Sequence, residues 1–247
     1  MGLKIVRDGT TWDLPGNFHL VDVGFQRRMD LIAKAFGDGG VNRGDDMIDI
    51  RMLSLEGEIF ADTDSQYDNK WNELVTKVAQ KDFYLEDGDW RILIGRAGMV
   101  GQTFPRGLRK RLGEIETELV ALDPFWYYKN LSSKGESCST PPTQFVVINT
   151  GSYAVYPIIK ITGDVNNPDM SVKNITDGDV LFSYQDSGFT AGKELVVDCK
   201  EGTVKLDGTN TIRYFNGQFL RLLPGNNTIE YNGVDAHVSF EWYKRKL

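Results

Sequence analysis

The chain has 247 residues, of which 40% are hydrophobic and 26% charged, so it can bury a packed core and is not of disordered composition. Its formal net charge of −7 argues against a protein that coats DNA or a membrane surface, since such proteins are normally basic. The first 130 residues hold 17 basic and 22 acidic side chains, so most of the negative charge lies there.

Cysteine usage and hydropathy indicate the compartment in which the protein is expected. Cys138 and Cys199 are too few for a disulfide scaffold, although the two could pair, so a reducing compartment is expected. The N-terminal residues lack the apolar core of a signal peptide. No apolar run reaches the roughly 18 residues that a membrane span needs, so we expect no membrane association.

The first half predicts strands, two hairpins and one helix. Asp8-Gly9 and Asp87-Gly88 are hairpin signals, the first between strands 3–7 and 11–14, the second between strands 83–86 and 90–94. Alternation predicts a strand over 19–32, and a long apolar run predicts another over 46–60. A single apolar stripe predicts a helix that Asp64 or Ser65 caps and that ends near Lys81. The stripe consists of Tyr67, Trp71, Leu74, Val75 and Val78.

A loop with four basic residues and a strand with three acidic ones close this half. The basic residues are Arg106, Arg109, Lys110 and Arg111. Over 113–122, Glu114, Glu116 and Glu118 alternate with apolar or neutral residues, which places the three carboxylates on one face of a strand. A solvated sheet face is the plain interpretation, and an acidic wall that repels an anion is the sharper one. The loop could bind phosphate, lie in solvent or form salt bridges between subunits.

The residue pattern of the chain changes at Asp123-Pro124-Phe125-Trp126. Proline lacks an N–H and disfavours helix in the preceding residue, so regular structure ends here. Residues 131–143 are rich in Ser, Gly, Thr and Pro, which predicts a linker. Short strands and turns fill the rest, which predicts a β-sandwich of jelly-roll type. The predicted strands are 145–149, 157–162, 170–174, 180–184, 194–199, 203–206, 218–222, 227–231 and 237–244.

No constellation of catalytic residues is visible. The only histidines are His19 and His237, and the sequence contains no nucleophile elbow, no P-loop and no dinucleotide-binding glycine pattern. We therefore expect no catalytic, cofactor or metal site, and no enzyme. The aromatic residues could form sugar-stacking platforms, but in a β-sandwich they more often belong to the core and to interfaces.

The second half resembles the C-terminal domain of the distal tail proteins of long-tailed phages, the siphovirus tail-component family. The residues that carry the resemblance are Gly163-Asp164 to Pro168, Thr190 to Cys199, Thr203 to Asn210 and Phe219 to Ile229. The Asp123 to Trp126 junction also recurs in that family, at the end of its N-terminal domain. The order of elements in the first half matches as well, so the resemblance covers essentially the whole chain.

The resemblance implies a structural virion protein at the phage tail tip, assembled in the bacterial cytoplasm. Its N-terminal domain, residues 1–130, would be a tail-tube-like split β-barrel with one helix that forms a homohexameric ring around the DNA channel. Residues 144–247 would be a galectin-like β-sandwich. The implied partners are the tail tube protein, the tape-measure protein and the tail-associated lysin or hub protein. In vitro the rings could also pair back to back as dodecamers. DNA would pass through without specific binding.

This resemblance assigns a role to each feature singled out above. Glu114, Glu116 and Glu118 would face the lumen, where carboxylates repel DNA phosphates. Pro124, Phe125 and Trp126 would pack between the two domains. The basic loop Arg106, Arg109, Lys110 and Arg111, together with strand 46–60, would supply the ring interface. The alternative is a carbohydrate-binding sandwich that contributes to adhesion to the host surface.

Overall fold

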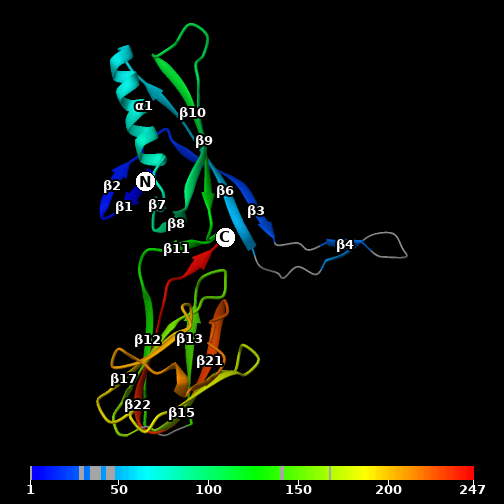
Figure 1. Ribbon diagram of the computed structural model, residues 1–247, viewed down its shortest axis with the longest axis vertical. Coiled ribbons are helices and arrows are strands. Elements are labelled where there is room, and N and C mark those ends of the chain that lie inside the picture. The colour runs from blue at the N-terminus through cyan, green and yellow to red at the C-terminus, as the bar shows by residue number, and fades with distance from the viewer. Residues whose placement is uncertain (1, 28–30, 34–39, 43–47, 140–141, 167) are drawn as a thin grey trace. The chain divides into compact units, whose positions relative to one another are not determined.

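The computed structural model describes every residue except 1, 28–30, 34–39, 43–47, 140–141 and 167. Its contacts divide the chain into two compact units, Met1–Trp126 and Tyr127–Leu247. Antiparallel strands dominate, and the described residues contain one α-helix (Figure 1), which confirms the predicted mainly-β fold. Among the described residues, no helix is long and apolar enough to cross a bilayer.

The first unit begins with a sheet built from two hairpins. Strands β1 (Lys4–Arg7) and β2 (Thr10–Asp13) pair around Asp8 and Gly9, whose φ angles of 48° and 75° suit a two-residue turn. Strand β7 (Phe83–Asp87) pairs with β1 and with β8 (Trp90–Ile94). Both predicted hairpins are therefore present.

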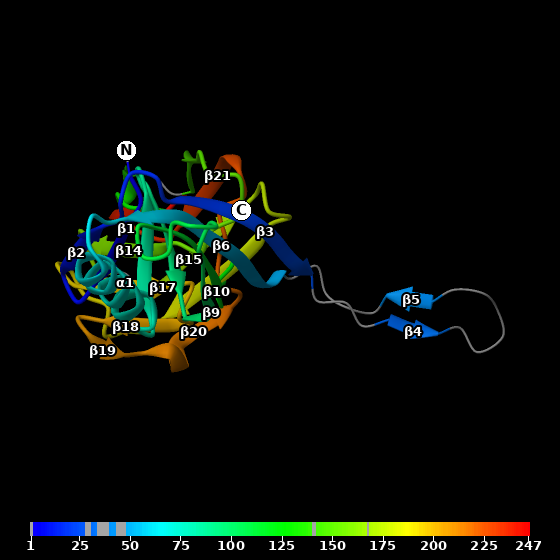
Figure 2. The same cartoon turned by 90° about the horizontal axis from the view of Figure 1, so that it is seen from above.

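The second sheet of this unit has the strand order β3-β6-β10-β9. These strands are β3 (His19–Arg27), β6 (Ile48–Phe60), β10 (Leu112–Ala121) and β9 (Arg96–Thr103). Figure 2 shows β3 and β6 running side by side. Of the predicted strand 19–32, residues 28–30 lie outside the described residues, as do 46 and 47 of the strand 46–60. The sequence did not predict β9, because its glycines and polar residues lack an apolar alternation.

A small separate sheet, β4 (Leu31–Ala33) with β5 (Gly40–Asn42), completes the strands of the first unit. Among the described residues these strands form open sheets, and no closed barrel is found.

Helix α1 (Asp64–Val78) packs on one face of the β3-β6-β10-β9 sheet. Tyr67, Leu74 and Val78 are its buried residues and share a core with Leu55 and Leu119 of the sheet. The predicted cap was one or two residues late. The side chain of Thr63 is the cap, since its oxygen accepts from the Gln66 N–H at 3.2 Å, and the helix ends before Lys81.

The second unit is a sandwich of two antiparallel sheets around one core, as predicted. One sheet has the order β12-β22-β14-β17-β18-β19 and the other β13-β21-β15-β16-β20. The first sheet contains β12 (Ser132–Cys138), β22 (Ala236–Trp242), β14 (Ile158–Gly163), β17 (Glu194–Asp198), β18 (Thr203–Leu206) and β19 (Thr209–Asn210). The second contains β13 (Thr143–Asn149), β21 (Gly225–Asn232), β15 (Asp169–Asn174), β16 (Val180–Gln185) and β20 (Phe215–Gly217). Short strands β11 (Trp126–Tyr128) and β23 (Arg245–Lys246) and the 3₁₀ turn η1 (Ile212–Tyr214) complete the elements.

The predicted linker 131–143 is wrong over most of its length. Ser132–Cys138 forms β12 and pairs with β22 along its whole length, from Ser132 opposite Trp242 to Cys138 opposite Ala236. Its small residues reflect close packing, because a Cβ on Gly135 would lie 2.9 Å from Nε2 of His237. Composition alone cannot separate such a strand from a flexible linker.

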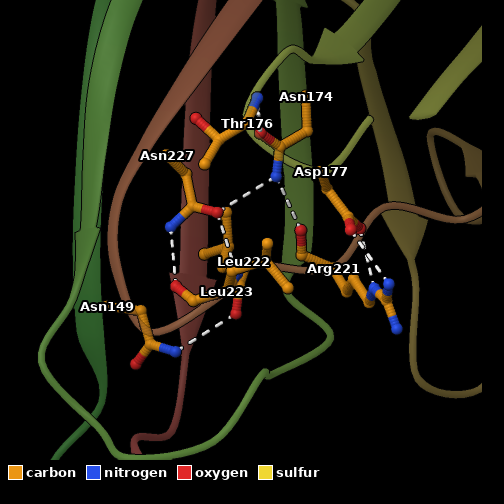
Figure 3. A network of polar contacts seen from close by, with 8 residues as sticks. All are labelled: Asn149, Asn174, Thr176, Asp177, Arg221, Leu222, Leu223 and Asn227. Atoms are coloured by element: carbon orange, nitrogen blue, oxygen red, sulfur yellow. Dashed lines mark hydrogen bonds and ion pairs between the residues drawn. The ribbon is translucent and has the colours of Figure 1, made fainter. Parts of the chain in front are cut away.

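The predicted strand 218–222 is also wrong, since only Leu222 makes a bridge there, with Val155. Buried amide side chains hold this segment instead (Figure 3). Asn174 donates to the carbonyl of Arg221 at 2.8 Å, and Asn149 donates to that of Leu222 at 3.1 Å. Asn227 accepts from the N–H of Leu223 at 2.8 Å. The three asparagines, all fully buried, therefore replace the missing strand pairing.

Candidate functional site

The acidic strand has the alternation that the sequence predicts. Along β10 the side chains of Glu114, Glu116 and Glu118 are exposed, while those of Ile115, Thr117 and Leu119 are buried. The three carboxylates therefore share the open face of the sheet, and α1 and the core occupy the other face.

The neighbouring strand β6 adds two further carboxylates to this face, which the sequence prediction missed. Glu58 lies directly opposite Glu114 and Glu56 directly opposite Glu116, whereas Glu118 lies opposite Ser54. Like charges directly opposite each other in an antiparallel pair destabilise a sheet. We call the five glutamates 56, 58, 114, 116 and 118 the acidic face. The acidic face can be recognised only from the pairing register of β6 with β10, and the sequence of one strand does not give that register.

An imidazole lies beside this face. The imidazole Nε2 of His19, which lies opposite Glu56 on β3, is 3.7 Å from that carboxylate. A shallow depression of about 540 Å³ runs over the face, between Asn17 and His19 on one side and Met99 and Thr103 on the other. The hydroxyl of Thr103 donates to Glu114 at 3.2 Å. The acidic face is therefore open to solvent or to a partner.

The outer strands of this sheet are β3 and β9, and neither has a second partner strand among the described residues. Val23 on β3 is 63% exposed and Met99 on β9 is 68% exposed, so both edges carry apolar side chains. Strand β6 lies between β3 and β10 with both of its edges paired. Strand β6 therefore has no unpaired edge to offer a neighbouring chain, and the part of strand 46–60 in a ring interface stays a prediction.

The predicted basic loop lies between β9 and β10, and its four cations divide into two pairs. Nζ of Lys110 is 2.7 Å from Oδ2 of Asp68, and the Arg111 guanidinium is 3.3 Å from Oδ1 of Asp64. These two cations tie the loop to the first turns of α1. Arg106 and Arg109 are exposed.

The junction Asp123 to Trp126 is anchored in the first unit by a residue that sequence reasoning missed. Arg51, 5% exposed on β6, donates to the carbonyl of Pro124 at 3.2 Å and forms an ion pair with Asp22. This hydrogen bond to Arg51, opposed in part by burial, lowers the pKa of Asp22. The sequence feature that could have indicated this contact is a single arginine within an apolar strand.

Trp126 is 8% exposed and belongs to the core of the first unit, and Phe125 is half-buried. The assignment of Pro124, Phe125 and Trp126 to packing between domains stays a prediction.

The aromatic side chains of the second unit do not form an exposed row. Phe215 stacks on Phe182 at 5.2 Å and on Phe219 at 4.6 Å between ring centroids, against the core. Among the described residues of this unit, Tyr156 and Tyr243 are the exposed aromatic rings, at 43% and 40%. This arrangement does not favour a sugar-stacking platform.

Comparison with known proteins agrees with this architecture. Residues 150–245 match the family model of the siphovirus-type tail component, C-terminal domain. The sequence matches none of the curated proteins. The fold is similar to the crystal structure of Dit (gp 19.1) of SPP1, described as a paradigm of the hub adsorption apparatus in phages that infect Gram-positive bacteria. The TM-score is 0.75 at 13% identity, with 99% of each chain covered.

A weaker likeness, with a TM-score of 0.43 at 10% identity over 97% of each chain, is to the phage P2 baseplate in its activated, Ca-containing conformation. The family match and the likeness to SPP1 Dit confirm the resemblance found in the sequence: residues 150–245 match the siphovirus-type tail component, C-terminal domain, and the chain has a fold similar to that of SPP1 Dit.

Proposed function

We propose that this chain is a structural component of a phage tail tip, a distal tail protein of the baseplate hub, and not an enzyme. Its first unit forms a ring around the DNA channel, and the second unit carries the connection to the host-adhesion apparatus. The proposal is supported by the family match of residues 150–245 and by the likeness in fold to SPP1 Dit. The ring is homohexameric and sits in the virion between the tail tube and tape-measure proteins and the tail-associated lysin or hub protein.

The acidic face is the observation that carries the channel proposal. Five glutamates share the open face of a four-stranded sheet, and two cross-strand pairs oppose like charges at a cost in stability. A surface that passes DNA must repel phosphate, since attraction would slow passage. We therefore place Glu114, Glu116 and Glu118 on the lumen, together with Glu56 and Glu58.

Ring closure follows from the two outer strands of the same sheet. In a head-to-tail ring each copy presents two different surfaces. Unpaired strand edges readily add a further strand, so β3 of one copy would pair with β9 of the next. Val23 and Met99, the exposed apolar residues of these edges, would then be covered. The lumen wall would be a continuous sheet with its acidic face inward.

The junction between the domains has a role in the same proposal. Arg51 fixes the Pro124 carbonyl and Trp126 is buried in the core, so the chain leaves the first unit from an anchored point. We propose that Pro124, Phe125 and Trp126 set the angle between the ring-forming domain, residues 1–130, and the sandwich domain, residues 144–247.

Native mass spectrometry and electron microscopy of the full chain test the ring. We expect a mass of six chains, or twelve where rings pair back to back, and images of a ring with a central hole. A monomer at tens of micromolar would overturn the ring.

A site-specific label tests which side of the ring the acidic face occupies. Glu116→Cys carrying a maleimide-gold cluster should place gold density in the central hole, whereas Glu201→Cys in the second unit should place it outside the hole. Gold on the outer rim from Glu116→Cys would overturn the lumen assignment and leave the ring intact.

A further inference from the structure

The first unit contains an apolar groove beside α1, which shares only Glu58 with the acidic face. It has a volume of about 330 Å³ and lies between α1, β2 and the end of β6. Trp12, Pro15, Phe18 and Phe60 line it, and we call it the α1 groove. Phe60 is 54% exposed, so its ring adds apolar surface to the open side of the groove.

The charge around the α1 groove is predominantly negative. Asp13, Glu58 and Glu73 line it, and Lys70 is its one lining cation among the described residues. Nζ of Lys70 donates to the carbonyl of Phe60 at 2.8 Å, which directs it to the groove wall. Asp13 is paired with Lys4 at 2.9 Å. An apolar floor beside Glu58 and Glu73 suits a ligand segment with an apolar side chain between cations.

The loop between β9 and β10 has that chemistry. Leu108, 43% exposed, stands between the exposed residues Arg106 and Arg109. The loop is ordered by its own turns, since Leu108 N–H donates to Pro105 at 3.0 Å and Arg111 N–H donates to Leu108 at 2.9 Å. A preorganised loop loses little conformational freedom when it docks.

In the proposed ring, strand directions would place this loop next to the α1 groove of a neighbouring copy. Successive strands of the β3-β6-β10-β9 sheet are antiparallel, so β3 and β9 run in opposite directions. His19 lies opposite Glu56, Glu56 opposite Glu116, and Glu116 opposite Gly101. The start of β3 and the end of β9 are therefore level across the sheet. The residues just beyond these ends are 15–18, of which Pro15, Asn17 and Phe18 line the groove, and the loop 104–111.

We propose that the loop 104–111 of one copy docks into the α1 groove of a second copy of this chain. Leu108 covers the exposed face of Phe60, and Arg106 and Arg109 face Glu58 and Glu73. The contact rests on the proposed ring, because antiparallel pairing of β3 with β9 between copies brings the two surfaces together. Lys110 and Arg111 hold the loop to α1 of its own copy and do not enter the groove.

Charge reversal on each surface tests the contact in the full chain. Arg106→Glu with Arg109→Glu should raise the concentration at which half of the chains are assembled by at least about tenfold, and Glu58→Arg with Glu73→Arg should do the same. Combining the four changes should restore assembly to within about threefold of the unchanged protein. Lys81→Glu, an exposed residue after α1, makes the same kind of charge change and should have no effect.

Cross-linking gives a second readout with a built-in specificity. Burial raises the pKa of the Cys138 thiol to about 11 and that of Cys199 to about 12, so engineered exposed cysteines react first. A mixture of Leu108→Cys and Pro15→Cys chains should give a disulfide-linked dimer under mild oxidation. Each variant alone should not, and a chain with both cysteines should give a ladder up to the ring.

The outcomes separate this contact from the ring itself. Rings that form normally, without cross-links and without sensitivity to the charge reversals, would overturn the docking of the loop and leave the proposed function standing. Absence of rings from the unchanged chain would overturn both.

Discussion

The acidic face of the first unit and three asparagines of the second unit differ in whether their polar groups are exposed or buried. We call Asn149, Asn174 and Asn227 the asparagine network. The acidic face carries five carboxylates, three exposed and two half-buried, and sets two pairs of them against each other. The network buries Asn149, Asn174 and Asn227 completely and gives each of them backbone partners. One arrangement costs stability and serves a surface, whereas the other contributes stability and fixes one conformation.

This difference explains why the second half is rich in motifs and the first half is not. A buried amide that donates and accepts at set distances is replaceable by almost no other residue, so the network fixes particular positions near Pro224 and Gly225. An acidic face needs only charge on one side of a sheet, which many sequences satisfy.

The largest effect we expect concerns the aromatic residue at the junction. Trp126→Ala removes a side chain that is 8% exposed and belongs to the core of the first unit. The free energy of unfolding of that unit should fall by about 3–5 kcal/mol, from lost burial and the cavity left behind. Urea denaturation followed by circular dichroism measures it. Leu122→Ala, at a residue 68% exposed, is the control and should change it by less than about 0.5 kcal/mol. Equal midpoints for both variants would show that Trp126 is not a core residue.

The asparagine network should show a slightly smaller loss, confined to the second unit. Asn227→Ala removes the acceptor of the Leu223 N–H and the donor to the Leu223 carbonyl, both at 2.8 Å. Buried groups are left without partners, so we expect a loss of about 2–4 kcal/mol in the free energy of unfolding of the second unit.

The matched control for the network is the adjacent residue. Asn226 is exposed, and Asn226→Ala should be nearly neutral. Thermal unfolding of the two variants checks the difference, and a similar loss in both would mean that turn conformation, not the buried amide, holds the segment.

Much of the fold could be predicted from the sequence, because in many elements the local sequence signal favours the same structure as the tertiary packing. The Asp8-Gly9 turn, the apolar stripe of α1 and the alternation of β10 each correspond to an observed element. The failures have a common physical cause. Strands β9 and β12 are rich in glycine and small polar residues, and their structure comes from pairing with a neighbour.

The candidate site was predicted in part for the same reason. Glu114, Glu116 and Glu118 were identified from alternation within one strand. Glu56, Glu58 and Arg51 were missed, because their roles depend on register with β10 and on a contact with Pro124 that is 73 positions distant. No local sequence pattern predicts such long-range pairings.

A pH-dependent prediction concerns Asp22 and its buried partner. The pKa of Asp22 is held below its ordinary value of 3.8 by Arg51, so the pair stabilises the first unit above pH 3.8 and loses that effect as the pH falls through the lower folded value. Asp22→Asn should cost about 1 kcal/mol at pH 7, a modest value because the Asp22 side chain is half exposed.

The difference in unfolding free energy between the unchanged chain and Asp22→Asn should therefore shrink as the pH falls below 3.8. Urea titrations of both proteins at pH 7, 5 and 3 measure it. A difference that is constant across this range would contradict the lowered pKa.

The smallest effect has the opposite sign and bears most directly on the acidic face. Glu114→Gln removes a charge that lies opposite Glu58, so it should stabilise the first unit by about 0.2–1 kcal/mol. Glu118→Gln, on the same strand but opposite Ser54, should give a smaller gain, and added salt should reduce the advantage of Glu114→Gln because screening weakens the repulsion that it removes. If both variants gained equally and salt had no effect, the opposed charges would carry no cost. The acidic face would then be an ordinary solvated surface, because a sheet that retains a destabilising arrangement requires a use for it, whereas a neutral arrangement does not.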